Sequence, residues 1–330
     1  MINIAYFFPF WVLTMALFFR KNMDFTKKSY LIASFLPIFL VLVNKSVVYD
    51  SDMFRYLVVF QELSSGVSFD HVTFHFEFGF LLLSKIISFF SNENSFFIFT
   101  ATLLYISLLV RLIYKLSYNI YYTTLIYICM GFVFYPSNIL RASIAVIILA
   151  NTLFIALPNI PLSVLFILIS SSFHSSMIIF STYLLVLDRF RKTIIIILVI
   201  ILSYIYSFYS YYSDSKFFAP NSIGATFPIS ILYIIMSLYF MINLKKIKTD
   251  LLSSKIYALF TLCAGISLLL SFKFFIFTRL YISFSVFIPL FLDTFSQSLK
   301  KEIRFTFIIT SSILYLVYYT FMVYYKNFSL

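Results

Sequence analysis

Long apolar runs alternate with short polar joints along this chain, which is the pattern of a helical protein that crosses a bilayer several times. A transmembrane barrel would instead show short segments of alternating polar and apolar residues, so the continuous runs predict helices and exclude a barrel. We expect helices at about residues 2–19, 30–48, 77–90, 95–113, 119–135, 139–157, 161–173, 175–187, 193–211, 226–244, 255–272, 279–297 and 305–325.

The run at residues 77–90 differs from the others because it is too short to span a membrane. A spanning helix needs about 20 apolar residues, whereas this run begins with an acid, Glu77, and contains Lys85. Its polar residues Glu77, Ser84, Lys85 and Ser88 share one face at helical spacing. We therefore predict a re-entrant or interfacial helix on the outer side of the membrane.

Lysine and arginine are concentrated in some of the joints, and the positive-inside rule places such joints in the cytoplasm. All of these basic joints fall on one side of the membrane only if the run at 77–90 does not cross it. The pattern therefore predicts about twelve transmembrane helices in one all-α polytopic domain over residues 1–330. Residues 49–95 then form an outer segment, and residues 210–226 form a second outer loop. The basic joints contain Arg20, Lys21, Lys27, Lys28, Arg111, Lys115, Arg189, Arg191, Lys192, Lys245, Lys246, Lys248, Lys255, Lys300, Lys301 and Arg304.

Composition supports the membrane assignment and changes how the net charge is interpreted. The chain is 62% hydrophobic and 11% charged, far from the average soluble protein, and its mean hydropathy is +1.01. The formal net charge of +12 is explained by the basic joints, so we expect no nucleic-acid partner. Cys129 and Cys263 lie inside apolar runs, and we expect neither a disulfide nor a metal site from them.

Residues 49–95 hold most of the unusual polar chemistry. Six of the twelve carboxylates and two of the three histidines lie there: Asp50, Asp52, Glu62, Asp70, Glu77, Glu93, His71 and His75. Ionisable groups in a membrane protein are costly unless they have a role, so we expect the functional site in this segment.

Two motifs in this segment supply candidate site residues. Asp52, Arg55 and Tyr56 are spaced i, i+3 and i+4, so a helix places them on one face; the alternative is a surface helix with a local ion pair. Glu77 precedes Gly79, which permits close approach of the backbone; the alternative is an acid that merely favours a helix N-terminus. We predict no metal and no cofactor, although the Asp50 and Asp52 spacing leaves a divalent ion as a minor alternative.

Three further polar residues lie at the predicted outer ends of helices. These are Arg141, His174 and Arg279, the last followed closely by Tyr281. Alone, an arginine at a helix end usually reaches toward lipid headgroups, and a histidine among serines is usually just hydrogen-bonded. Together with the acids on the same side, they suit a ligand that carries phosphate.

The segments SDMFRY, FEFGFLLLSKI, LRASIAVIIL and SSFHSS, in this order, resemble the EpsG-type branch of the bacterial Wzy polysaccharide polymerases. The resemblance covers about residues 45–190, with a weaker match at Arg279 and Tyr281. Two positions depart from the family pattern: Phe78 stands where the family commonly has proline, and Ala142 where it often has glutamine.

The resemblance implies a glycosyltransferase of O-antigen or exopolysaccharide biosynthesis in the bacterial inner membrane. Such an enzyme joins oligosaccharide repeat units carried on undecaprenyl pyrophosphate at the periplasmic face. Its expected partners are that lipid-linked oligosaccharide, membrane lipid, a chain-length regulator and a flippase.

The resemblance also distributes roles among the candidates. Glu77 or Asp52 would serve as the base, and His174 would assist the phosphate or the acceptor. Substrate and pyrophosphate contacts would come from Arg141, Arg279, Arg55, Tyr56 and Tyr281.

Two other classes of membrane protein remain open from the residues. A transporter or flippase of lipid-linked oligosaccharide also fits twelve spans, but transporters tend to show internal repeats and polar residues at the membrane midplane. Another membrane transferase, such as an O-antigen ligase, is the second alternative; its large outer loop usually comes late in the chain, whereas here it comes early.

Overall fold

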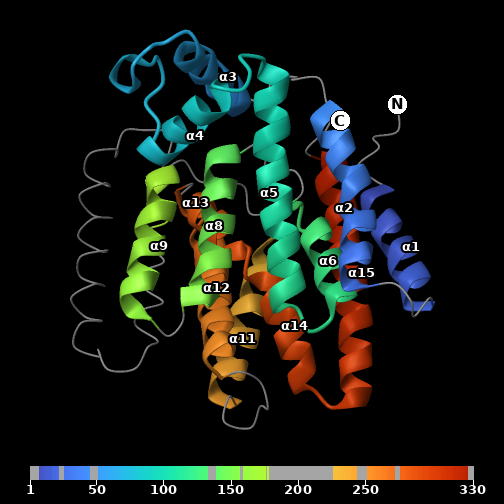
Figure 1. Cartoon of the computed structure of the whole chain (residues 1–330). Coiled ribbons are helices and arrows are strands. Elements are labelled where there is room, and N and C mark those ends of the chain that lie inside the picture. The colour runs from blue at the N-terminus through green and yellow to red at the C-terminus, as the bar shows by residue number, and fades with distance from the viewer. Residues whose placement is uncertain are drawn as a thin grey trace, which may run out of the picture. The chain divides into compact units, whose positions relative to one another are not determined.

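The computed structural model describes residues 7–21, 26–44, 51–132, 139–156, 159–175, 177, 226–243, 251–271 and 276–325. Every regular element in these residues is helical, which confirms the all-helical prediction for this part of the chain. The predicted run at 193–211 lies outside it, as do nearly all of the predicted run at 175–187 and of the predicted loop at 210–226. The elements are α1 (Phe7–Lys21), α2 (Lys27–Asn44), α3 (Ser51–Ser64), the 3₁₀ turn η2 (Phe69–His71), α4 (Phe78–Ser88), α5 (Asn94–Leu116), α6 (Ile120–Cys129), α8 (Leu140–Ala156), α9 (Ile160–Phe173), α11 (Thr226–Asn243), α12 (Leu251–Leu270), α13 (Ile276–Ser285), α14 (Ile288–Ser298) and α15 (Lys301–Tyr325) (Figure 1).

The chain divides into two compact units. The first unit comprises Met1–Asn151, Ser172–Ser175 and Leu299–Leu330, and the second comprises Thr152–Ser171 and Ser176–Ser298. In the first unit α5 packs against α2, α3, α4 and α6, while α1 and α15 pack against α6. In the second unit α12 packs against α11, α13 and α14. The expectation of one transmembrane domain concerns how the two units join and stays a prediction.

Two described helices are long and apolar enough to cross a bilayer: α5, and residues Lys301–Thr320 of α15. Seven other apolar helices or helix segments have 10 to 17 residues, below the length that a straight span needs. The count of about twelve spans therefore stays a prediction.

The predicted single helix at 279–297 is wrong, because the chain turns at residues 286–287 between α13 and α14. Pro289 explains the break. Proline has no N–H, so it leaves the carbonyl of Ser285 without its helical donor, and its ring clashes with that carbonyl. Proline is tolerated in the first turn of a helix, where α14 places it.

The short run that begins at Glu77 forms a short helix, as predicted. α4 has 11 residues, which corresponds to a length of about 16 Å at 1.5 Å per residue and is too little to cross the hydrocarbon core. Its predicted place at the outer membrane surface stays a prediction.

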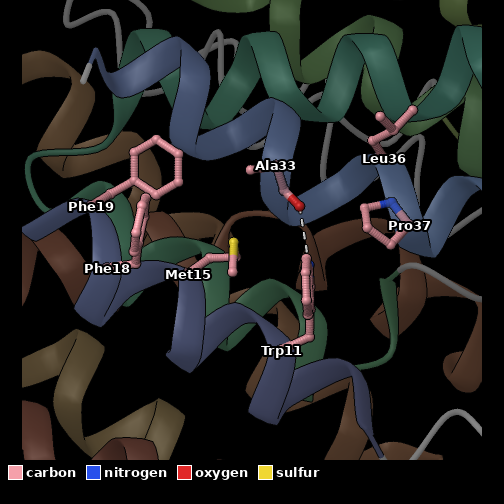
Figure 2. A pocket seen from close by; sticks show the side chains of 7 residues that line it. All are labelled: Trp11, Met15, Phe18, Phe19, Ala33, Leu36 and Pro37. Atoms are coloured by element: carbon pink, nitrogen blue, oxygen red, sulfur yellow. Dashed lines mark hydrogen bonds between the residues drawn. The ribbon is translucent and has the colours of Figure 1, made fainter.

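A proline inside α2 is compensated by a side chain from α1. Pro37 cannot donate to the carbonyl of Ala33, four residues earlier. Trp11, the only tryptophan in the chain, donates its indole N–H to that carbonyl at 3.0 Å (Figure 2). This bond joins α1 to α2. It also satisfies a carbonyl that would have no water to bond to in a hydrocarbon environment.

Trp11→Phe is expected to destabilise the protein by about 1 to 3 kcal/mol, because it leaves the Ala33 carbonyl unsatisfied while keeping an aromatic ring. In a Pro37→Ala background residue 37 regains its N–H, so the same change should cost much less. Thermal unfolding in detergent of the purified full-length wild type, the two single variants and the double variant completes a double-mutant cycle. Equal losses in the two backgrounds would contradict the pairing.

Candidate active site

The loop from α3 to α4 delivers Glu77 to a defined position. α3 ends at Ser64, and Gly66 follows with a φ of +96°, a left-handed conformation that glycine adopts without strain. Glu77 is the N-cap of α4, and its backbone carbonyl accepts from the N–H groups of Phe80 and Leu81 at 3.0 and 3.2 Å. Its side chain makes no capping bond, so the carboxylate is available to residues outside α4.

Two side chains fasten this loop to the helices on either side. The Glu62 carboxylate accepts hydrogen bonds from both the N–H and the hydroxyl of Thr73, the former at 2.9 Å. Lys85 donates from α4 to the carbonyl of Leu63 at 2.7 Å, satisfying an acceptor at the C-terminus of α3. The loop is thereby closed against α3 and α4 before it reaches Glu77.

An aromatic cluster underlies the loop. The Tyr56 ring lies 5.3 Å from that of Phe76 and 5.2 Å from that of Phe80, measured between centroids. Phe60 stacks on Phe97 of α5 at 4.7 Å. Tyr56 is only 4% exposed, so its ring is part of the packing that supports Glu77. Burial raises the pKa of Tyr56, which keeps its hydroxyl protonated.

The Glu77 carboxylate binds residues from two distant parts of the chain. One oxygen, Oε2, accepts from Arg141 Nη1 in an ion pair. The other, Oε1, lies 3.3 Å from His174 Nδ1 and accepts from the N–H and hydroxyl of Ser175 at 3.0 and 3.2 Å. Side-chain exposure is 21% for Glu77, 19% for Arg141 and 12% for His174, so the cluster is mostly shielded from solvent.

Gly79 allows the end of α9 to reach this cluster. A Cβ at Gly79 would lie 2.8 Å from the carbonyl oxygen of Ser172 and 2.9 Å from its carbonyl carbon, closer than real Cβ atoms come. Ser172 precedes His174 by two residues, so the missing side chain at Gly79 lets His174 and Ser175 contact Glu77.

Arg141 is held on several sides. Its guanidinium lies over the Phe76 ring, 4.5 Å from the centroid, in cation–π geometry. Its Nε atom is buried and has no hydrogen-bond partner within the described residues. Arg141 therefore has donor capacity beyond the bond to Glu77.

The electrostatics of Glu77 follow from these contacts. Burial acts to raise its pKa, but the hydrogen bond from His174, the positive charge of Arg141 and the N–H of Ser175 outweigh burial. The pKa of Glu77 falls from its usual 4.5 to about 2. The carboxylate is therefore ionised, and it is a weak proton acceptor while these partners remain bound.

Among the candidates in α3, Tyr56 interacts with Arg141, whereas the described contacts of Asp52 and Arg55 do not involve Glu77. Arg55 and Asp52 form a loose ion pair at 3.9 Å, with side chains 53% and 41% exposed, as their helical spacing predicts. Arg55 also lies over the Phe74 ring, 5.6 Å from its centroid. Asp50 lies outside the described residues.

Arg279 and Tyr281 lie in α13, within the second unit. Tyr281 is half-buried, and the side chain of Arg279 is outside what the structure describes. Their predicted place beside the Glu77 cluster stays a prediction.

Sequence reasoning missed Ser175, Phe76 and the role of Ser172. Ser175 was visible only as the neighbour of His174, and its backbone N–H has no sequence signature at all. Phe76 was one of many aromatic residues in the segment, so its position over Arg141 needed the tertiary contact to be seen.

Gly79→Ala is expected to cost about 1 to 3 kcal/mol of stability, since the backbone of Ser172 must move to admit the methyl group. Ser172→Ala is the matched control; it leaves the backbone in place and should unfold nearly like the wild type. The double variant should remain destabilised, because the clash is with backbone atoms. Thermal unfolding of the full-length proteins measures both effects, and a fully stable Gly79→Ala protein would contradict the close approach.

Comparison with known proteins places the chain in a family. The model of the EpsG family matches residues 28–330, which include α2 from its second residue and every later described helix as well as Glu77, Arg141 and His174. No curated protein and no solved structure matches the chain. The family is one of membrane proteins of polysaccharide biosynthesis, associated with glycosyltransferase-like polymerisation. The match spans nearly the whole chain, which therefore belongs to the EpsG family.

Proposed function

We propose that this protein is a polymerase that joins oligosaccharide repeat units carried on undecaprenyl pyrophosphate at the periplasmic face of the bacterial inner membrane. A hydroxyl of the incoming unit attacks the anomeric carbon of the growing chain and forms the new glycosidic bond. The bond from that carbon to the pyrophosphate oxygen breaks, the hydroxyl proton passes to a base, and undecaprenyl pyrophosphate leaves with the electron pair.

The observation that carries this proposal is the convergence of Glu77, Arg141 and His174 in one partly buried cluster within the family-matched region. Arg141 and His174 are 64 and 97 positions from Glu77 in the chain. Ionisable groups gathered in this way in an apolar protein support a functional site.

His174 is the proton acceptor in this proposal. An ionised carboxylate only accepts hydrogen bonds, so the bond to Glu77 requires the proton on His174 Nδ1. In the neutral ring the other nitrogen, Nε2, is then unprotonated and able to take the acceptor's proton. Glu77 fixes the tautomer and stabilises the imidazolium that forms, as the carboxylate does in a catalytic triad. The alternative bases, Glu77 and Asp52, are less favoured, Glu77 because its pKa is about 2.

Arg141 neutralises the developing pyrophosphate charge, and its pairing with Glu77 sets a condition on that role. While Glu77 occupies Nη1, the pair carries no net charge. A pyrophosphate must therefore use the remaining N–H groups of Arg141 or displace Glu77. Arg279 is proposed as a second cation, and Arg55, Tyr56 and Tyr281 as further contacts around the substrate.

A polysaccharide ladder tests the function. In a gene-deleted strain, wild type is expected to restore long chains, whereas His174→Gln should leave carriers that bear a single repeat unit. His75→Gln removes an exposed histidine two residues from Glu77 and is the matched control, which should restore the full ladder. A full ladder from His174→Gln at equal protein level would overturn the assignment. Loss of even the single repeat in the deleted strain would point to export or ligation.

Binding of inorganic pyrophosphate tests the role of the ion pair apart from catalysis. Glu77→Gln keeps the shape of the side chain but frees the Arg141 charge, so the variant should bind pyrophosphate about tenfold tighter, a gain of about 1.4 kcal/mol. Arg141→Gln should bind it more weakly than the wild type. Calorimetric titration of the purified full-length proteins measures both, and equal affinity in wild type and Glu77→Gln would contradict the competition.

A further inference from the structure

An open apolar groove lies between α1 and α2, away from the Glu77 cluster. It has a volume of about 420 Å³, and the described residues that line it are all apolar: Trp11, Met15, Phe18, Phe19, Ala33, Leu36 and Pro37 (Figure 2). Trp11, Phe18 and Leu36 are 38%, 50% and 50% exposed. The indole N–H is already bonded to Ala33, so the groove offers hydrocarbon contacts and no free donor from Trp11.

The helix pair is basic at the end where α1 stops and α2 starts. α1 ends just beyond Arg20 and α2 begins at Lys27, so these residues and Lys28 lie at the same end of the helix pair, and all three are exposed. The Lys28 Nζ atom lies 5.7 Å from the centroid of the Tyr114 ring, and Lys115 Nζ lies 5.9 Å from the same centroid. The two lysines thus share one aromatic ring at the C-terminal end of α5.

These cations have no acidic partner in the described part of the chain. The salt bridges found there involve Glu77 and Asp52, not the lysines around Tyr114. Positive charge without an acidic partner among the described residues therefore lies at one end of this helix pair, and it is complementary to the anionic head of an amphiphile whose chain fills the groove.

The basic end lies far from the Glu77 cluster along α5. Phe97 of α5 contacts Phe80 of α4 with ring centroids 6.3 Å apart, three residues from Glu77. Lys115 is 18 residues further along the same helix, which corresponds to about 27 Å at 1.5 Å per residue. Two contacts, Phe39 with Phe99 and Lys28 with Tyr114, fix the antiparallel alignment of α2 on α5 (Figure 1). The separation approaches the thickness of a bilayer core, about 30 Å.

We propose that the α1–α2 groove binds an anionic phospholipid of the leaflet opposite the Glu77 cluster. One acyl chain lies in the groove against Trp11 and Leu36, and the headgroup phosphate is bound between Lys28 and Lys115. This inference rests on the membrane location, not on the polymerase reaction. The 27 Å separation makes this lipid distinct from the pyrophosphate proposed at Arg141.

The single tryptophan makes the groove directly measurable. The purified full-length protein is reconstituted into vesicles of phosphatidylcholine and phosphatidylglycerol, with bromine on the acyl chains of one lipid at a time. Bromine quenches only nearby indole, so the fluorescence of Trp11 reports which lipid occupies the groove. Brominated phosphatidylglycerol should quench beyond its bulk fraction, with a roughly fivefold preference from each lysine.

Lys28→Gln with Lys115→Gln should reduce quenching to the level of random mixing. The control, Lys300→Gln with Lys301→Gln, removes the same charge from exposed residues at the start of α15 that are not part of the contact of Lys28 and Lys115 with Tyr114, and should keep the preference. Equal quenching by both brominated lipids in the wild type would overturn the proposal. So would a loss of preference in the control, because that would mean general surface attraction. If the wild-type protein showed no polymerase activity but still preferred phosphatidylglycerol, the lipid proposal would stand and the proposed polymerase function would be contradicted.

Discussion

The Glu77 carboxylate joins three parts of the chain that are otherwise unrelated in sequence. A carboxylate that is four-fifths shielded from solvent is stable only if its charge is paired and its oxygens accept hydrogen bonds, and removing one partner of a buried pair is costly. Arg141, His174 and Ser175 supply those bonds. The surrounding features serve the same constraint: the turn at Gly66 and the bonds of Glu62 and Lys85 hold the loop, and the absence of a side chain at Gly79 admits the end of α9.

The same constraint gives the cluster its chemical character. An arginine paired with a carboxylate is a poor anion trap, and a carboxylate paired with an arginine is a poor base. Arg141 becomes a better anion-binding group, and Glu77 a better proton acceptor, only when the ion pair between them is broken. A dianionic ligand is the kind of group that competes with Glu77 for Arg141. The imidazole is the one member of the three whose proton-accepting nitrogen is left outside the ion pair. In the proposed reaction, Glu77 would therefore couple the binding of a phosphate-bearing donor at Arg141 to proton transfer at His174.

α5 relates this cluster to the rest of the first unit. Its first turns pack on the aromatic residues beneath Glu77, and its last turn brings Lys115 beside Lys28. Among the described residues, the Glu77 cluster thus lies at one end of α5 and lysines without an acidic partner lie at the other. In a hydrocarbon environment the backbone groups between the two ends would have to bond to one another without water. The bond from Trp11 to Ala33 meets this requirement where Pro37 removes a donor from α2.

The sequence alone determined the local features of this protein. Hydrophobic runs determined that the described chain is helical, the length of the run after Glu77 determined that α4 is short, and the spacing of Asp52 and Arg55 predicted their pairing, because all three depend on contacts within a few residues. Resemblance of short motifs identified the family, and it selected Glu77, Arg141 and His174 as candidates. The tertiary structure decided that these three side chains meet, that Ser175 joins them through its backbone, and that Tyr56 is buried beneath them. It also decided that Trp11 completes α2. Contacts between residues 22 to 98 positions apart depend on how helices pack, and no local pattern of residues encodes that packing.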